Sequence, residues 1–240
     1  MSDPTAGISI DFGRFVQGRE ADFAAHVVGG VPDYAFSLDW SIRRKLDMVA
    51  PLRKLAEAMT AGTVPVQRAL FEANGVAVGP TQFPQVHDMG VRCAERLGIG
   101  VPQLFVIQEP RINAFTYATG TVDQIVVLTS GLIDAADPAE LLTVIGHECG
   151  HIHNRHVVYN TLWEVLTNDI ARGLLSSVLR RLARASVVGL LVEAAFSAAV
   201  SALFYRWHRC AELTCDRAGL ICSGDIAAAR RLPGKLSLGQ

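Results

Sequence analysis

The most informative stretch of the sequence is His147-Glu148-Cys149-Gly150-His151, an H-E-x-x-H pentapeptide that continues an apolar run at residues 141–146. The run favours a helix, and on a helix the side chains of residues i and i+4 lie on one face. His147 and His151 can therefore reach one metal ion. Glu148 can reach a water molecule beside that ion and act as a general base. The pentapeptide thus indicates a metal-dependent hydrolase.

Composition limits the other classes of function. The 240 residues carry a formal net charge of −1, which gives no electrostatic basis for binding nucleic acid. The five cysteines have no paired spacing, which favours reduced, buried thiols and a cytosolic setting. Residues 1–15 lack the basic and apolar regions of a signal peptide. We therefore expect a cytoplasmic protein, with membrane association as the alternative.

Local patterns predict an α+β fold that is mostly α-helical and contains a small three-stranded sheet. Apolar periodicity gives the helices, and short β-branched and aromatic runs between turn residues give the strands. Asp137 precedes a proline and is followed by a glutamate three residues on, which is typical of a helix start. The expected elements are a helix at 37–60 with a break near Pro51, a helix at 81–97 capped by Thr81 and ended by Gly98, strands at 103–107, 112–119 and 124–129, and a helix from Asp137 to about Tyr159.

A catalytic zinc ion needs a third protein ligand besides two histidines. The metzincin pattern would place it six residues after the second histidine, where this sequence has Val157, with His156 one residue out of register. The other option is a later helix on which Glu212 and Asp216 share a face. Glu212 could bind the metal, while Asp216 accepts a hydrogen bond from a ligand imidazole and fixes its tautomer. The competing interpretation is an acidic pair on a solvated helix face.

Four segments, taken together, resemble the gluzincin metallopeptidases of the HtpX heat-shock protease and CAAX prenyl-protease group. The resemblance covers roughly residues 100–224 and implies a zincin-like catalytic domain in which the H-E-x-x-H helix packs against a long third-ligand helix. Because no repeat or linker interrupts residues 81–240, we expect them to form this one domain. Residues 1–80 match nothing in the group and are expected to form a helical extension. The segments are Asn113-Ala114-Phe115 (a substrate-side strand), residues 128–132, residues 146–151 followed by His156, and Arg209-x-x-Glu212-x-x-x-Asp216.

These motifs predict a zinc-dependent endopeptidase. His147, His151 and Glu212 would bind Zn²⁺, and Glu148 would take a proton from the zinc-activated water that attacks the peptide carbonyl. The resemblance further implies that Asn113, Ala114 and Phe115 bind the backbone of an extended polypeptide substrate. An ordinary hairpin strand with no contact to substrate would have the same sequence pattern. The alternative is a catalytically idle zinc-binding protein, chaperone-like or membrane-associated, on the same scaffold. An intact Glu148 beside the metal argues for the enzyme.

The oxyanion formed during hydrolysis needs a donor besides zinc. Arg209, His208 and Tyr205 are the candidates, and the resemblance favours Arg209. The competing interpretation gives these side chains a structural role in a polar seam. For His156, a structural hydrogen bond is favoured over zinc ligation.

Residues 186–204 form a mostly apolar stretch that is long enough for a transmembrane helix and carries one charge, Glu193. A single crossing would separate His151 from Glu212 on opposite sides of a bilayer. The polar residues also recur at i+3 or i+4, as expected for one continuous helix with a polar seam. We therefore expect a buried helix, with a membrane-embedded protease as the alternative. The seam consists of Glu193, Ser197, Ser201, Tyr205, His208, Glu212 and Asp216.

Overall fold

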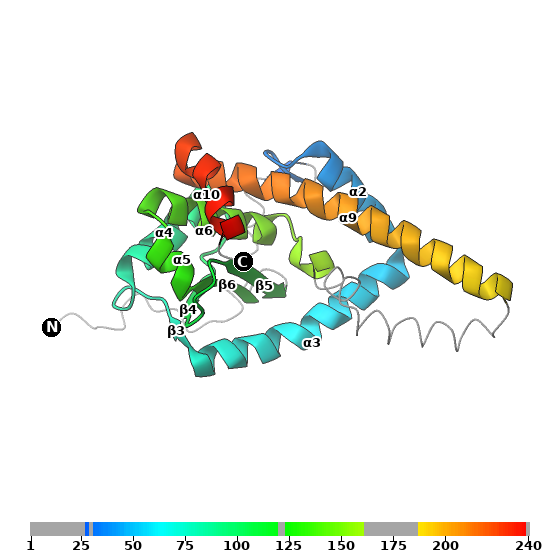
Figure 1. The fold of residues 1–240 in the computed structure, drawn as a ribbon, viewed down its shortest axis with the longest axis horizontal. Helices are drawn as coiled ribbons and strands as arrows, with labels where there is room; N and C mark the ends of the chain where they lie inside the picture. Colours follow the sequence, from blue (N-terminus) through cyan, green and yellow to red (C-terminus); the bar gives the residue numbers. More distant parts are fainter. Residues whose placement is uncertain (1–26, 29–30, 120–122, 161–186, 239–240) are drawn as a thin grey trace.

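The computed structural model describes residues 27–28, 31–119, 123–160 and 187–238 (Figure 1). These residues form a mostly helical molecule with one small mixed sheet, which confirms the predicted α+β class. Two short strands, β1 (Val27–Val28) and β2 (Val31–Pro32), pair with each other ahead of the first described helix.

The main sheet has four strands in the order β3-β4-β6-β5. The predicted strands are present as β4 (Gln103–Ile107), β5 (Ala114–Thr119) and β6 (Asp123–Thr129). The expectation of three strands was incomplete, because β3 (Gly75–Ala77) pairs antiparallel with β4. β4 and β6 are parallel, and β5 is antiparallel to β6. Among the described strands, β5 therefore has one neighbour and lies at an end of the sheet.

The strands alternate their side chains between two cores. Leu104 and Val126 face a cluster formed with the later helices, whereas Phe105 and Val127 face a second cluster that includes Phe71. This period of two is what a strand buried on both faces requires. Helix α3, which carries Phe71, consequently covers one face of the sheet, and the helix that carries the H-E-x-x-H motif packs with other helices against the opposite face (Figure 1).

The predicted helix at 37–60 is present as two helices, α2 (Ser37–Met48) and α3 (Ala50–Asn74). They separate at Val49, so the expected break near Pro51 is confirmed, and Pro51 lies in the first turn of α3, where a missing N–H is harmless. α3 continues well beyond residue 60 and ends where β3 begins.

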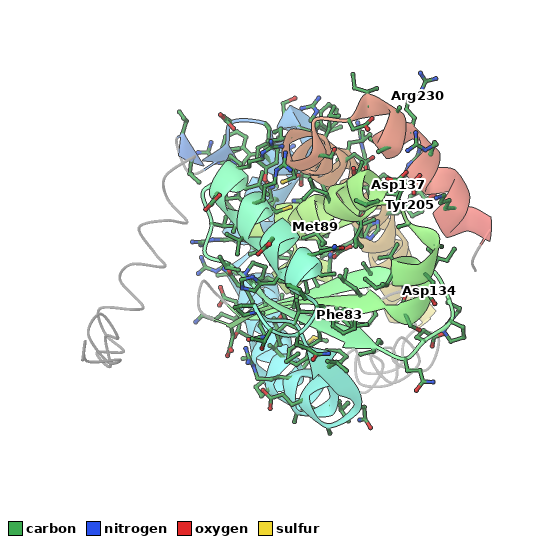
Figure 2. The ribbon with its side chains drawn as sticks, turned by 90° about the vertical axis from the view of Figure 1, so that its left-hand side faces the viewer. Phe83, Met89, Asp134, Asp137, Tyr205 and Arg230 are labelled. Carbon is green, nitrogen blue, oxygen red and sulfur yellow. The ribbon has the colours of Figure 1, made fainter. Side chains whose placement is uncertain are left out.

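Helix α4 (Pro84–Leu97) begins later than predicted. Thr81 does not cap it, because Gly79 and Gln82 hydrogen-bond to each other and hold Thr81 in a tight turn. The residue before the helix is instead Phe83 (Figure 2). Its backbone is in the left-handed conformation, with φ of 55°. Gly98 ends the helix as predicted, with φ of 67°. A short helix, α5 (Ser130–Ala135), follows β6.

Helix α6 (Pro138–His153) begins at a capping box formed by Asp137 and Glu140, as predicted. It ends at His153 and does not continue to Tyr159. Arg155 adopts a left-handed φ of 54°, which interrupts the helix, and helical backbone resumes at Val157. The helix predicted to carry the polar seam is α9 (Val187–Ser223), which is followed by α10 (Ile226–Leu238).

α6 and α9 cross with their backbones in close approach. A Cβ atom on Gly146 would lie 2.5 Å from Cys222 Cβ, and one on Gly219 would lie 2.7 Å from the carbonyl oxygen of Thr143. Glycine at the crossing therefore lets the helices approach more closely than alanine would allow. All five cysteines are buried free thiols, as expected, and Cys222 and Cys215 of α9 lie against Gly146 and Gly150 of α6 at this crossing.

Among the described residues, no helix has the length and apolar character needed to cross a membrane. Most of the 186–204 stretch belongs to α9, but the side chains of residues 187–201 lie outside the described part of the structure. The predicted seam at Glu193, Ser197 and Ser201 therefore stays a prediction.

The division at residue 80 also stays a prediction. The described segments before it are closely packed against the rest: α2 contributes Ile42 and Leu46 to a cluster with Trp207 of α9, and α3 packs on the sheet.

Candidate metal centre

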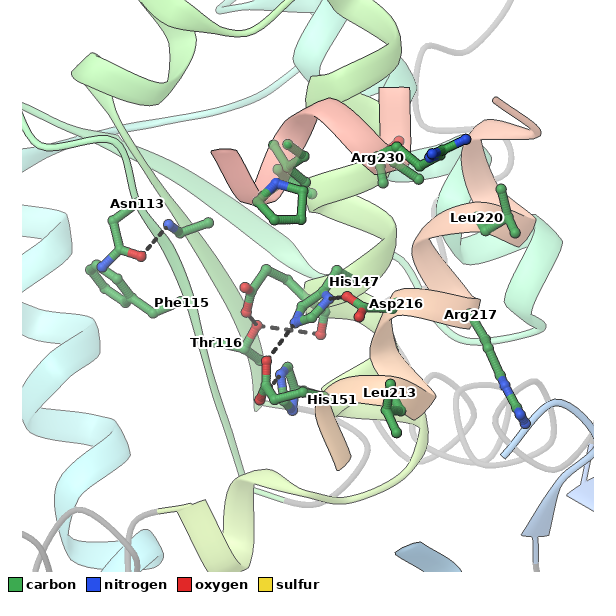
Figure 3. Close-up of a pocket in the computed structure, with 18 of the residues that line it drawn as sticks. Asn113, Phe115, Thr116, His147, His151, Leu213, Asp216, Arg217, Leu220 and Arg230 are labelled. Atoms are coloured by element: carbon green, nitrogen blue, oxygen red, sulfur yellow. Dashed lines mark hydrogen bonds and ion pairs between the residues drawn. The ribbon is translucent and has the colours of Figure 1, made fainter. Parts of the chain in front are cut away.

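A cavity of about 790 Å³ lies between α6, α9, α10 and the end strand β5 (Figure 3). α6 supplies His147, Glu148 and His151 to its wall, and α9 supplies Glu212 and Asp216. The i, i+4 spacing on each helix turns the two pairs toward the same space. The structure thus brings together the five residues on which the predicted metal site depends.

Each of the two histidines lies from the Glu212 carboxylate at about the ligand–ligand spacing of a tetrahedral zinc ion. Glu212 Oε2 lies 3.3 Å from His147 Nε2, and Glu212 Oε1 lies 3.5 Å from His151 Nε2. Two ligand atoms bound at 2.0–2.1 Å to a tetrahedral ion would be roughly 3.4 Å apart. Two imidazoles and one carboxylate are also a donor set that zinc accepts in catalytic sites. The residues present therefore fit a zinc ion.

Burial, hydrogen bonds and neighbouring charges set the pKa values of the three donor groups. Burial alone lowers the pKa of His147, but Asp216, 3.1 Å from Nδ1, and Glu212 outweigh burial and raise it to about 10. Burial and the neighbouring His147 lower the pKa of His151 far below its usual value. Burial raises the pKa of Glu212, but its histidine partners override burial and lower it to about 2. Glu212 is therefore an anion facing a neutral His151 at neutral pH.

Glu148 is held by Thr116 of β5. Thr116 Oγ1 donates a hydrogen bond to Glu148 Oε2 at 2.6 Å, and the side chains meet beside His147 (Figure 3). Burial raises the pKa of Glu148, while the positive charge of His147 and the Thr116 hydrogen bond oppose that rise. Sequence reasoning missed Thr116. Strand alternation could have found it, because Thr116 follows Ala114 on the same face of the expected strand.

Cys215 is a rival third ligand. One donor atom from each of His147, His151 and Cys215 lies within 4.8 Å of the others. The thiol is fully buried, however, and does not line the cavity; its sulfur lies 3.5 Å from Nδ1 of His156. Burial, with the charge of Glu212, raises the pKa of Cys215 far above its usual value, which disfavours the thiolate that zinc binds. Glu212 fits the third position better.

The other predicted site residues are divided between the cavity and the surface. Asn113, Ala114 and Phe115 all line the cavity. Figure 3 shows Asn113 and Phe115 on the side away from Leu213 and Arg217 of α9. His208 also lines it, with Nε2 3.7 Å from Glu212 Oε1. Arg209 is exposed on α9 and is absent from the cavity wall, as is Tyr205, which is 56% exposed.

Two helix-borne imidazoles, an adjacent glutamate and a carboxylate from a second helix form the arrangement expected of a gluzincin centre. The sequence model of peptidase family M48 matches residues 80–235, and the chain belongs to this family. The match confirms the resemblance to the HtpX group that the motifs indicated.

Individual proteins are also similar to parts of this chain. Plastoglobule-localized metallopeptidase 48, chloroplastic, from Arabidopsis thaliana is 31% identical over 199 residues, which are 80% of this chain and 52% of that protein. Protease HtpX from Xanthomonas euvesicatoria pv. vesicatoria is 34% identical over 106 residues, which are 44% of this chain and 33% of that protein. The crystal structure of S. mikatae Ste24p aligns with a TM-score of 0.48 and 18% identity, over 96% of this chain and 57% of that one. The chain thus spans about half the length, or less, of these curated relatives.

Proposed function

We propose that the protein is a zinc-dependent endopeptidase that hydrolyses extended polypeptides. The observation that carries the proposal is the position of the Glu212 carboxylate between Nε2 of His147 and Nε2 of His151, at 3.3 and 3.5 Å, in a cavity that Glu148 also lines. Membership of a peptidase family supports the same reaction class. These three side chains would hold the ion, which when bound acts as a Lewis acid that lowers the pKa of water and polarises a carbonyl.

Glu148 is the general base of the proposed reaction. Its Oε2 is occupied by the Thr116 hydroxyl, which leaves Oε1 to accept a proton from the attacking water. The raised pKa of the buried carboxyl makes it a stronger base than a solvated glutamate. Glu148 then passes the proton to the nitrogen of the departing amine, because the protonated carboxyl is an acid of suitable strength for that step.

His208 is the better-placed donor for the developing oxyanion. Its ring lines the cavity beside Glu212, whereas Arg209 is exposed outside it. An N–H group aimed at the carbonyl oxygen would stabilise negative charge in a site partly closed to water. We therefore assign this role to His208 in preference to Arg209.

The substrate would bind as an added strand on β5. Asn113, Ala114 and Phe115 lie along the cavity, and β5 pairs on its other side with β6. Backbone N–H and C=O groups on such an edge recognise an extended chain independently of its sequence. Apolar side chains on the remaining walls, among them Leu213, Leu220 and Leu232, would contact substrate side chains.

Metal content by elemental analysis, measured for wild type and Glu212→Ala in parallel, tests the proposal. We expect about one zinc per wild-type chain, as one three-ligand site requires, and a large loss in the variant. Cys215→Ser is the matched control for the rival ligand and should retain zinc. Peptide hydrolysis should disappear in Glu148→Gln although zinc is retained. Wild type that binds no zinc, or Glu212→Ala that keeps it while Cys215→Ser loses it, would contradict the assignment.

A further inference from the structure

A chain of buried polar groups leads from the candidate ligand His151 to helix α2. His151 Nδ1 lies 3.2 Å from Nδ1 of His156, and Nε2 of His156 lies 3.0 Å from Oδ2 of Asp39. His156 has no exposed surface and Asp39 is 2% exposed. We infer that Asp39 is a positioning residue for the metal ligand His151 and acts through His156. The inference rests on the proposed function, because it concerns how the zinc ligand is oriented.

The proton positions follow from the chemistry of the three groups. When His151 binds a metal through Nε2, its ring proton is on Nδ1. The hydrogen bond from that N–H is accepted by Nδ1 of His156, which must then be unprotonated. The ring proton of His156 is therefore on Nε2. Asp39 is the acceptor that this arrangement needs, because a carboxylate accepts hydrogen bonds and donates none. The carboxylate thereby selects one tautomer in each of the two rings.

Asp39 is itself held in place by α9. Thr214 Oγ1 donates a hydrogen bond to Asp39 Oδ2 at 2.7 Å and accepts one from the backbone N–H of Phe36 at 3.1 Å. Burial alone would raise the pKa of Asp39, but the hydrogen bonds from His156 and Thr214 and the charge of Arg43 lower it. Asp39 is therefore ionised at neutral pH, as an acceptor for His156 must be.

The geometry separates this role from direct metal binding by His156. The nitrogen that His156 presents to His151 faces Nδ1, whereas the Glu212 carboxylate faces Nε2 on the other side of the ring. The ring of His156 also packs edge-on against Trp207, with centroids 5.7 Å apart, which fixes its plane. His156 is thus placed to orient His151 and not to join it on the ion.

The two candidate histidine ligands are consequently oriented in different ways. Asp216, on the third-ligand helix, contacts His147 directly and is largely exposed. His151 is oriented through a buried two-step chain that ends at Asp39, a residue outside the 80–235 segment matched by the family. The α2 segment that precedes the family match therefore completes the site. Carboxylates that hydrogen-bond a ligand histidine commonly change metal affinity 10- to 100-fold when removed.

Zinc affinity, measured by competition with a chelator, tests the inference when Asp39→Ala is compared with Asp47→Ala. Asp47 is the matched control, because it also lies on α2 and accepts a long-range hydrogen bond, from Tyr159 at 2.6 Å, but has no contact with His156. We expect roughly 10- to 100-fold weaker zinc binding in Asp39→Ala and a change of about twofold or less in Asp47→Ala. The d–d absorption spectrum of the Co²⁺-loaded protein should shift in Asp39→Ala alone, because the ligand geometry relaxes.

A second pair of variants keeps the test decisive if Asp39→Ala fails to fold. The side-chain oxygen of asparagine at position 156 would lie near the place of Nδ1 of histidine and could still accept the hydrogen bond from Nδ1–H of His151. The side-chain oxygen of glutamine would lie nearer the place of Nε2 and could not accept that hydrogen bond. His156→Asn should therefore bind zinc more tightly than His156→Gln. Equal affinities in this pair, wild-type affinity in Asp39→Ala, or equal losses in Asp39→Ala and Asp47→Ala would each overturn the inference while zinc binding by the wild type stands. Wild type without zinc would instead remove the proposed function itself.

Discussion

Thr116 makes the contact at the site that can be removed with least disturbance to the strand. Thr116→Val deletes the hydroxyl that donates to Glu148 Oε2 at 2.6 Å and keeps the shape of the side chain. A hydrogen bond to a charged group contributes about 1.5–3 kcal/mol, so kcat for peptide hydrolysis should fall by roughly tenfold or more, with KM little changed. Steady-state kinetics on an unstructured peptide would measure kcat and KM separately.

Thr116→Ser is the matched control for this prediction. Serine restores the hydroxyl and loses only the methyl group, so its kcat should return toward the wild-type value. If Thr116→Ser were as impaired as Thr116→Val, the hydroxyl would not be the cause, and packing of β5 against α6 would explain the loss.

The residues of the site differ in how far they could be predicted from the sequence. His147, Glu148 and His151 follow from local helical periodicity, and Glu212 and Asp216 repeat it on a second helix. Strand alternation places Thr116 on the same face as Ala114, but the contact partners of Thr116 and Asp39 could not be predicted, because they lie 32 residues from Thr116 and 117 residues from Asp39. Such contacts depend on how strands and helices pack, and helical or strand periodicity alone does not specify that. His156 was correctly expected to make a hydrogen bond, but its partners were not identified.

The crossing of α6 and α9 depends on glycine at the level of whole elements. A Cβ atom at Gly219 would lie 2.7 Å from the Thr143 carbonyl oxygen, a backbone atom that cannot rotate away. Gly219→Ala should therefore push the helices apart and lower the free energy of unfolding by about 1–3 kcal/mol. Zinc affinity should fall in parallel, because Glu212 would move away from the histidines. Urea unfolding and chelator competition would report the two effects.

Gly62 supplies the comparison for that substitution. It lies exposed in the interior of α3, and a Cβ atom there would meet nothing within 4 Å. Gly62→Ala should raise the free energy of unfolding by about 0.5–1 kcal/mol, because alanine is the better helix former. A stabilised Gly219→Ala would show that the helices can separate without loss.

Sequence patterns predicted most elements, but they missed one strand and one helix end that depend on contacts with distant residues. β3 consists of three residues beginning with glycine, and it becomes a strand only because β4 offers an edge. α6 ends at His153 because residues of the N-terminal region bind the turn that follows: Arg43 donates to the carbonyl oxygen of Asn154, and the Asn154 amide donates to Tyr34 Oη. No local signal around residue 155 predicts that turn.

Across the whole molecule, an ion-pair network attaches α10 to the start of α6. Glu140 has no exposed surface and accepts hydrogen bonds from Lys235 Nζ at 2.6 Å and Arg231 Nε at 3.0 Å. Burial by itself raises the pKa of Glu140, but Lys235, the backbone N–H of Asp137 and Arg231 outweigh burial and lower it. Because the pKa is lower in the folded state, the pairing stabilises the fold at neutral pH. That contribution is lost as the pH falls through the folded-state value, below the usual value of about 4.3.

Glu140→Gln should consequently be less stable than wild type at neutral pH by about 1 kcal/mol, a modest value because both cations are partly exposed and screened by solvent. The difference should shrink as the pH falls below the usual glutamate pKa of about 4.3 and through the lower folded-state pKa, because wild-type Glu140 then takes up a proton and loses the pairing. Urea unfolding of both proteins across pH 3–7 would measure it. The exposed Glu95→Gln on α4 is the control and should follow the wild-type curve. A difference that stayed constant with pH would show that packing, not charge, is responsible.

The buried thiols have a consequence for recovery after unfolding. While the fold is intact, Cys93, Cys149, Cys210, Cys215 and Cys222 are shielded from oxidants. Unfolding exposes all five at once, and an odd number cannot pair off completely within one chain. Thermal inactivation in air would therefore trap scrambled and intermolecular disulfides. The measured half-life would then report the rate of irreversible inactivation and not the free energy of unfolding. Because buried free thiols fill part of the core, refolding after thermal unfolding depends on a reducing solvent.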